Sequence, residues 1–224
     1  MSRTSIPDGW LGAQPKMGEL KMRVDSHRDA EFKVRGDNEV KIKLKTGLPV
    51  KVVTKLTQVS TDTDLPQFVL TQRKDKDSLT FYVAFPDNGF YKFQIFSLEE
   101  SSESESLPNV YNYLVEVSDN YKPPTGYVKT YTKFYTDCCW LERPRSLHQG
   151  SPRLDDVQFE LRVPGAQKVA VHCGEEWFHL SEKDGQWEGR ADLDRYKGKD
   201  AKVTVNANYN KDDNSYSVLL EYRI

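Results

Sequence analysis

One stretch constrains the fold more than any other: residues 79–96, which read as two apolar strands joined by a tight turn. In 79–85 apolar side chains alternate with their neighbours, so one set can face a core. The turn at 86–89, Pro-Asp-Asn-Gly, combines the fixed φ of proline with residues that tolerate the left-handed region. Tyr91, Phe93 and Ile95 alternate in the same way after the turn and are expected to face the core from the second strand. We expect a β-hairpin that needs a second sheet to cover it.

Other short segments alternate in the same way and are bounded by Gly, Pro, Asn or Asp. They are 20–24, 31–34, 40–44, 50–56, 68–72 and 111–117, then 134–141, 157–163, 169–173, 177–180, 187–193, 203–207 and 216–222. Strands of this length with such turns are typical of antiparallel sandwiches. No amphipathic helix is expected.

The two halves of the chain show a weak repeat. Val40–Leu44 resembles Val157–Leu161, and a Tyr-x-x-Leu-[Val/Leu]-Glu pattern occurs at 111–116 and at 216–221. A length of 224 residues suits two domains. The sequence therefore predicts an all-β fold of two tandem antiparallel Ig-like β-sandwich domains, where Ig-like describes architecture only. The expected division is an extended lead-in (1–19), a first sandwich (20–118), a Pro-containing linker (119–130) and a second sandwich (131–224).

Charge and composition exclude several classes of function. The 32 Lys and Arg residues balance 34 Asp and Glu residues, for a net charge of −2 and a pI near 6.1. A nucleic-acid or membrane surface would want a clustered basic excess. No secretory signal or membrane span is visible, and three cysteines make no disulfide framework. We expect a cytoplasmic protein without membrane insertion and without nucleic acid as a partner.

The residues that could carry chemistry do not form a recognised constellation. His172 and Cys173 are neighbours in a strand, so their side chains point to opposite faces, and Cys173 is expected in the core. His179 could approach His172, with Glu175 or Glu176 nearby, but this set has no recognised metal spacing.

The remaining thiols and histidines are interpreted as structural. Cys138 and Cys139 should diverge, one to the core and one to the surface, and His27 and His148 should be solvated. No phosphate loop or nucleophile elbow occurs. We therefore predict no catalytic, cofactor-binding or metal-binding residue, no cofactor, and no enzyme activity.

Two further features stay open as sites of interaction. Trp140, Trp177 and Trp187 are expected in the core, although an exposed cluster of Trp with Tyr would indicate a binding face. The acidic, serine-rich segment 99–106 is expected to be a solvated loop, with a phosphorylation segment or a contact for a basic partner as the alternative.

Several stretches resemble the C-terminal region of kyphoscoliosis-peptidase-like proteins, including the hillarins. They are 8–15 (Asp-Gly-Trp-Leu-Gly-Ala-Gln-Pro), 85–91 (Phe-Pro-Asp-Asn-Gly-Phe-Tyr) with Ile95 and Phe96, 107–113 (Leu-Pro-Asn-Val-Tyr-Asn-Tyr), 163–166 (Val-Pro-Gly-Ala) and 219–222 (Leu-Leu-Glu-Tyr). The resemblance implies β-sandwich modules of the kind that follow a transglutaminase-like domain with a Cys-His-Asp constellation. It also implies an association with the cytoskeleton and, in vertebrates, with the muscle Z-disc.

No position of this sequence matches the catalytic motif of that family, so the chain is expected to hold the modules without the transglutaminase-like domain. The leading hypothesis is a non-catalytic protein-interaction or scaffold module with a protein partner, cytoskeletal by the resemblance. The alternative is an accessory region of a transglutaminase-like peptidase or cross-linking enzyme on a longer product. A carbohydrate- or calcium-binding sandwich is a third hypothesis. Edge strands in either unit could pair with another chain.

Overall fold

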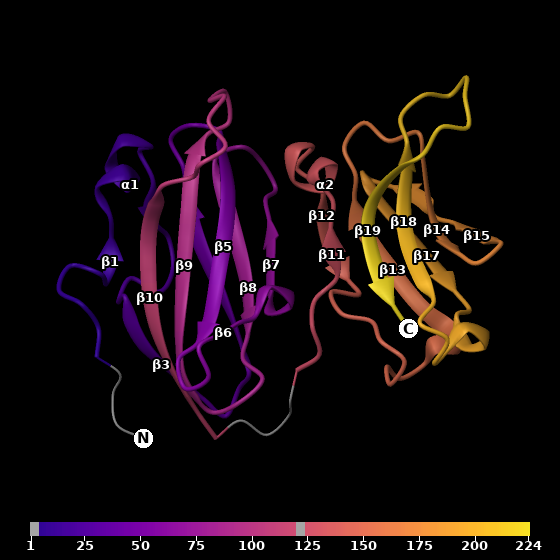
Figure 1. The fold of residues 1–224 in the computed structure, drawn as a ribbon. Helices are drawn as coiled ribbons and strands as arrows, with labels where there is room; N and C mark the ends of the chain where they lie inside the picture. The colour runs from indigo at the N-terminus through magenta and orange to yellow at the C-terminus, as the bar shows by residue number, and fades with distance from the viewer. Residues whose placement is uncertain (1–4, 120–123) are drawn as a thin grey trace. The chain divides into compact units, whose positions relative to one another are not determined.

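A computed structural model describes residues 5–119 and 124–224, and in these it has nineteen strands, two one-turn α-helices and three 3₁₀ turns (Figure 1). The chain divides into two compact units, Met1–Thr71 with Asp75–Gly126, and Gln72–Lys74 with Tyr127–Ile224. Each unit is an antiparallel β-sandwich, so the predicted all-β fold is confirmed. Residues 120–123 of the expected linker lie outside the described residues.

The first unit packs a six-stranded sheet against a four-stranded one. The larger sheet has the order β1-β10-β9-β5-β6, with β3 parallel to β10, and the smaller has the order β2-β4-β8-β7. The strands of the larger sheet are β1 (Gly12–Ala13), β3 (Glu31–Arg35), β5 (Val50–Gln58), β6 (Thr63–Asp64), β9 (Gly89–Glu99) and β10 (Asn109–Ser118). Those of the smaller sheet are β2 (Arg23–Val24), β4 (Glu39–Lys45), β7 (Val69–Gln72) and β8 (Ser78–Ala84), and a 3₁₀ turn, η1 (Pro66–Phe68), precedes β7.

The stretch expected to be a hairpin is instead a connection between the two sheets. β8 pairs with β4 and β9 pairs with β5 and β10, so β8 and β9 lie in different layers. Both still turn their apolar faces to one core: Phe81 and Phe93 meet edge to face with ring centroids 5.7 Å apart. The hydroxyl of Tyr91 holds the turn by donating to the Asp87 carbonyl at 2.8 Å and accepting from the Asp87 N–H at 3.1 Å. The hairpin prediction was therefore wrong in its pairing and right in its inward face.

The second unit has the same strand order with fewer strands. Its larger sheet is β11-β19-β18-β14-β15 and its smaller sheet is β12-β13-β17-β16. The strands of the larger sheet are β11 (Lys129–Thr130), β14 (Lys168–Cys173), β15 (Glu176–His179), β18 (Lys202–Asn208) and β19 (Ser217–Arg223). Those of the smaller sheet are β12 (Trp140–Arg143), β13 (Val157–Arg162), β16 (Ser181–Lys183) and β17 (Gln186–Ala191), and the 3₁₀ turns are η2 (Leu154–Asp156) and η3 (Asp194–Tyr196).

Both units open with a two-residue strand followed by a single helical turn, α1 (Pro15–Glu19) and α2 (Thr132–Thr136). The predicted extended lead-in and the predicted strand at 134–141 both differ from this. Each turn buries one apolar side chain, Met17 or Phe134. Each is followed by a residue with positive φ, Lys21 at 51° or Cys138 at 55°. Alternating patterns could not reveal such turns, because a single helical turn has too few residues to establish a period.

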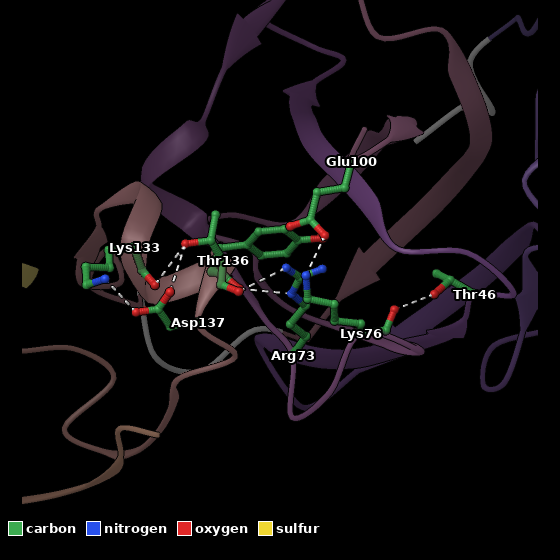
Figure 2. Close-up of polar contacts among 8 residues, drawn as sticks. Thr46, Arg73, Lys76, Glu100, Lys133, Thr136 and Asp137 are labelled. Atoms are coloured by element: carbon green, nitrogen blue, oxygen red, sulfur yellow. Dashed lines mark hydrogen bonds and ion pairs between the residues drawn. The ribbon is translucent and has the colours of Figure 1, made fainter. Parts of the chain in front are cut away.

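Gln72–Lys74 belongs to the second unit although it lies far from the rest in sequence. Arg73 is buried, and its Nε donates to the Tyr135 carbonyl at 2.9 Å and its Nη2 to that of Thr136 at 3.4 Å (Figure 2). The guanidinium carbon lies 3.9 Å from the centre of the Tyr135 ring. These donors reach carbonyl groups at the end of α2, where the Tyr135 carbonyl also accepts from the Cys138 N–H at 3.1 Å. Lys133 and Asp137 add an ion pair of 2.9 Å along the same turn.

Candidate functional site

Two large apolar side chains stand out on the described surface because they are exposed. Val53 on β5 is 56% exposed and Trp177 on β15 is 44% exposed. Each unit supplies one of them, and each lies on its unit's larger sheet. Trp177 was expected in the core with Trp140 and Trp187. The latter two are buried, at 4% and 8% exposure, so the expectation was wrong for Trp177 alone.

Trp177 is the centre of an aromatic cluster formed with His172 and Tyr216. The ring of Trp177 lies 4.4 Å from that of His172 and 5.0 Å from that of Tyr216, centroid to centroid. His172 on β14 is directly opposite Trp177 on β15. This is the condition under which the sequence would indicate a binding face, a Trp with a Tyr at the surface.

The strand that carries Trp177 is the outermost of its sheet, with one edge free of strand pairing in the described residues. The N–H of Leu180 donates to the Val169 carbonyl at 2.9 Å, which fixes the phase of the ladder with β14. Because hydrogen-bonded and non-hydrogen-bonded pairs alternate in an antiparallel ladder, Trp177 and His179 form the non-hydrogen-bonded pairs with β14. Their backbone N–H and C=O groups therefore point away from β14, toward the open edge.

The turn between β14 and β15 fixes this edge in place. Gly174 has φ +59°, and a Cβ there would lie 2.8 Å from a ring carbon of Tyr196. Only glycine accepts both the left-handed conformation and that close approach. Glu176 accepts from the Tyr196 hydroxyl at 2.9 Å and pairs with Arg195. The first residue of β15 is thus bonded to η3, and these contacts fix the strand at the residue before Trp177.

Two of the three thiols, those of Cys139 and Cys173, lie in buried environments that suppress reactivity. Burial raises the pKa of Cys139 to about 12 and also raises the pKa of Cys173. Cys173 is fully buried while His172 beside it lies on the other face of β14, as predicted. Cys138 is partly exposed and Cys139 is buried, which confirms the expected divergence, although a left-handed turn rather than a strand produces it. A thiolate nucleophile would need a lowered pKa and a nearby base.

The histidines and acids weighed as metal ligands do not come together. His179 is opposite Ala170, two residues along β14 from His172. Within 5–119 and 124–224 no group of three His, Cys, Asp or Glu side chains could hold a metal ion. The carboxylate of Glu176 is engaged by Arg195 and Tyr196. The arrangement around Trp177 is suited to recognition by contact rather than to ligation.

His27 and His148 are half-buried rather than solvated as expected. The ring of His27 lies 4.9 Å from that of Phe32, and burial lowers its pKa. His148 accepts at Nδ1 from the Gly150 N–H at 3.1 Å. Packing against β3 accounts for His27 and a hydrogen bond within its own turn accounts for His148, and loop composition reveals neither.

The acidic loop between β9 and β10 is largely exposed, as predicted. Its backbone is anchored by Lys51, whose ammonium donates to the Ser102 carbonyl at 2.5 Å. Lys76 pairs with Glu100 at 2.9 Å, and the Thr46 hydroxyl donates to the Lys76 carbonyl at 3.0 Å (Figure 2). No helix in the described parts of the chain has the length and apolar character needed to cross a bilayer.

Residues 7–127, just over half of the chain, match the model of the KY-like, immunoglobulin-like domain. No curated protein sequence matches the chain. Among solved structures, the complex of Dpr2 Ig1-Ig2 with DIP-Theta Ig1-Ig3 is similar at 12% identity, over 89% of this chain and 96% of that one, with a TM-score of 0.28. The titin I-band fragment I67-I69 is similar at 13% identity, over 90% of this chain and 64% of that one, with a TM-score of 0.24. The low TM-scores mean that these likenesses carry no argument about the chain.

Proposed function

Because the chain belongs to the KY-like, immunoglobulin-like family, we propose that it is a non-catalytic protein-interaction module that binds through its second unit. One observation carries the proposal: the aromatic cluster of His172, Trp177 and Tyr216 lies beside an open strand edge. Exposed aromatic residues next to unpaired backbone groups combine the two elements of strand addition, main-chain pairing and a side-chain anchor.

The partner in this proposal presents an extended segment that adds to β15. The outward N–H and C=O groups of Trp177 and His179 supply the main-chain hydrogen bonds. An apolar side chain of the segment packs on the exposed part of the Trp177 indole, which is 44% exposed beside the His172 and Tyr216 rings. Burying such a side chain contributes about 1.5–3 kcal/mol. Backbone pairing then gives affinity, and the aromatic cluster gives selectivity for apolar residues.

The partner class we propose is cytoskeletal, since the family resemblance of the sequence implies that association. Affinity capture with the full chain from muscle or fibroblast lysate, read by quantitative mass spectrometry, tests it. We expect cytoskeletal proteins to be enriched by the native chain and lost with Trp177→Ala. Lys43→Ala, which changes an exposed residue of β4 outside this site, is the control and should retain them.

A second pair of variants tests the strand-addition mechanism separately from the aromatic contact. His179→Pro removes an N–H that faces the open edge and leaves the ladder with β14 intact. We expect His179→Pro to weaken capture and His179→Ala to have little effect. Equal capture by both variants would contradict strand addition, and equal capture by native chain and Trp177→Ala would contradict the site.

Family membership also supports a second candidate, an accessory region of a transglutaminase-like enzyme on a longer product. The same aromatic cluster would then hold a substrate protein for the catalytic domain. Transamidation by a longer product, compared between native and Trp177→Ala forms at several substrate concentrations, separates the two. A raised KM with unchanged kcat would favour the accessory role, and no change in either would exclude it.

A further inference from the structure

The larger sheet of the first unit carries a second surface with a different chemistry. Register places Val53 opposite Phe96, Lys51 opposite Leu98, and Thr57 opposite Lys92. These side chains point away from the core, because the alternate residues of β9, from Tyr91 to Ile95, are fully buried. We call this surface the Val53 face, defined by Val53, Phe96 and Leu98 with Lys51, Lys55 and Lys92.

The centre of the Val53 face is apolar where an outer sheet face is ordinarily polar. Val53 is 56% exposed, and Phe96 and Leu98 are each half-buried. The second unit offers a direct comparison, because Ala170 and Asn206 occupy the same register as Val53 and Phe96 and are both buried. In the second unit these two positions are buried, whereas in the first unit three neighbouring apolar side chains are exposed or half-exposed to solvent. Grouped exposed apolar residues mark interaction sites.

The rim of the Val53 face is basic, and two of its three lysines lack a carboxylate. Lys51 donates to a backbone carbonyl, that of Ser102, and Lys92 lies 5.6 Å from the centre of the Trp10 ring. Lys55 pairs with Asp64 at 3.3 Å. Among the described residues no ion pair engages Lys51 or Lys92. The face therefore has positive charge available at two places around an apolar centre.

We propose that the Val53 face binds an extended, acidic segment of a partner protein that also carries apolar side chains. Lys51, Val53 and Lys55 are alternate residues of one strand, so the two lysines flank Val53 along about 13 Å of strand. Lys51 has no carboxylate partner, and Lys55 would share its charge between Asp64 and the segment. A partner strand that alternates acidic, apolar and acidic residues at every second position matches this spacing. Nucleic acid fits less well, since its phosphates would leave Phe96 and Leu98 without partners and the face offers no arginine.

The acidic loop beside the face explains how such a segment would be selected. Ser102, held by Lys51, lies in the loop that also contains Glu99, Glu103 and Glu105. These carboxylates adjoin the Lys51 end, so a partner that is acidic throughout would be repelled there. A segment that presents a single carboxylate to Lys51 and separates its acidic residues by apolar ones is favoured over one that is acidic throughout. The inference concerns the first unit and does not rest on the Trp177 site.

Selection of random nonapeptides on the full chain tests the proposal, followed by anisotropy measurements with the selected peptides. We expect enrichment of Asp or Glu alternating with Leu, Ile or Phe, and at least tenfold weaker binding to Val53→Asp and to Lys51→Glu. Val53→Thr keeps the branched side chain and should bind several-fold more weakly, which guards against a folding defect in Val53→Asp. Lys43→Glu, which makes the same charge change at an exposed residue of β4, is the matched control and should bind as the native chain does.

Three outcomes of the peptide experiment would overturn the proposal. They are selection of peptides without acidic residues, failure to select any peptide, and equal binding to native chain and Val53→Asp. A fluorescent single-stranded 12-mer oligonucleotide serves as the competing probe. If it bound the native chain in a Val53-dependent manner while the peptides did not, the ligand class would be wrong. Binding of the selected peptides should also weaken as salt is raised, because exposed lysines are screened.

Discussion

The two units share one framework and differ in what they place on it. A row of residues across four strands runs Gly12, Asn112, Gln94 and Lys55 in the first unit. The same row in the second unit runs Lys129, Glu221, Thr204 and His172. None of the four positions keeps its residue. The framework therefore resides in strand order and backbone pairing, and the outer faces are free to diverge into a basic apolar surface and an aromatic one.

The helical turn at the start of each unit also keeps its backbone hydrogen bonds although its residues differ. The N–H of Gln14 donates to Val110 and that of Tyr131 to Leu219, each at 2.9 Å. Five residues after the buried apolar residue the chain closes again: the N–H of Met22 donates to the Met17 carbonyl and that of Cys139 to the Phe134 carbonyl, both at 3.0 Å. The sequences Pro-Lys-Met-Gly-Glu and Thr-Lys-Phe-Tyr-Thr share only a lysine and a buried apolar residue at the third position.

Removing the buried side chain of each turn should give the largest loss of stability among these predictions. It also tests whether α1 and α2 stabilise their units in the same way. Phe134→Ala should destabilise the second unit by about 3–5 kcal/mol, since it leaves a cavity under α2. Met17→Ala should destabilise the first unit by about 2–4 kcal/mol for the same reason. Hydrogen exchange in increasing denaturant, read separately for peptides of each unit, measures both. If either variant loosened both units equally, the units would not be independent.

A buried carboxylate distinguishes the units in their response to acid. Glu221 is 8% exposed, accepts from the Tyr131 hydroxyl at 2.6 Å and pairs with Lys202 at 3.0 Å. The Tyr131 hydrogen bond, followed by Lys202, holds the pKa of Glu221 below its ordinary value of 4.5, against burial, which raises it. A depressed pKa gives stability that is present above the unfolded value and is lost as the pH falls through the folded one.

Tyr131→Phe should therefore cost about 1.5 kcal/mol near neutral pH, and the cost should shrink as the pH falls below 4.5. The matching position of the first unit is Gln14, whose amide donates to backbone carbonyls of Gly9 and Trp10 at 3.1 Å. Gln14→Leu is the control, and its cost should not change with pH. Urea unfolding at pH 7, 5 and 3.5 measures both, and a pH-independent cost for Tyr131→Phe would contradict the assignment.

Two buried tyrosines at the same framework position differ in a single hydrogen bond. The hydroxyl of Tyr222 donates to the Pro144 carbonyl at 2.8 Å, whereas that of Tyr113 has no partner among the described residues. Tyr222→Phe should cost about 1 kcal/mol, while Tyr113→Phe should be neutral or slightly stabilising. Thermal melts of the two variants measure this directly. A loss for Tyr113→Phe as large as for Tyr222→Phe would mean that the Tyr113 hydroxyl is satisfied in solution.

The smallest expected change in stability concerns the positive-φ residue that follows each helical turn. Lys21 and Cys138 both have positive φ, which costs an L-residue free energy that glycine does not lose. Lys21→Gly and Cys138→Gly should each stabilise the chain by about 0.5 kcal/mol, after the entropy that glycine adds to the unfolded chain. The midpoint of guanidinium unfolding is a sufficient measure. Opposite signs for the two variants would show that the turns are not equivalent.

The sequence predicted the strands well because their alternation is strong. The faces of β4, β9 and β13 follow from period two, and the correspondence of β4 with β13 is confirmed by their equal places in the smaller sheets. The correspondence of the last strands was wrong by four residues, since pairing matches Val110 with Leu219 and Asn112 with Glu221. A tyrosine pattern cannot fix register, because register depends on the partner strand.

The candidate sites were less predictable, for two physical reasons. Whether Trp177 is core or surface depends on the turn at Gly174, which sets it opposite His172 on the outer face. A two-residue turn after Cys173 could have shown this from the sequence. The exposure of Val53 could not be predicted, because it depends on what the rest of the chain leaves uncovered. Family membership was predicted from turn and strand motifs and is confirmed for residues 7–127.

The strand β3 has a mechanical consequence. β1 runs antiparallel to β10, so tension on the two ends of the first unit would separate their hydrogen bonds one after another. β3 runs parallel to β10 along Leu114–Ser118, so the same tension would load its hydrogen bonds together, in shear. In the described part of the second unit no strand lies parallel to β19. Under load, the five parallel residue pairs between β3 and β10 would resist unfolding of the first unit. The described second unit has no such pairing, so we expect it to unfold before the first unit does.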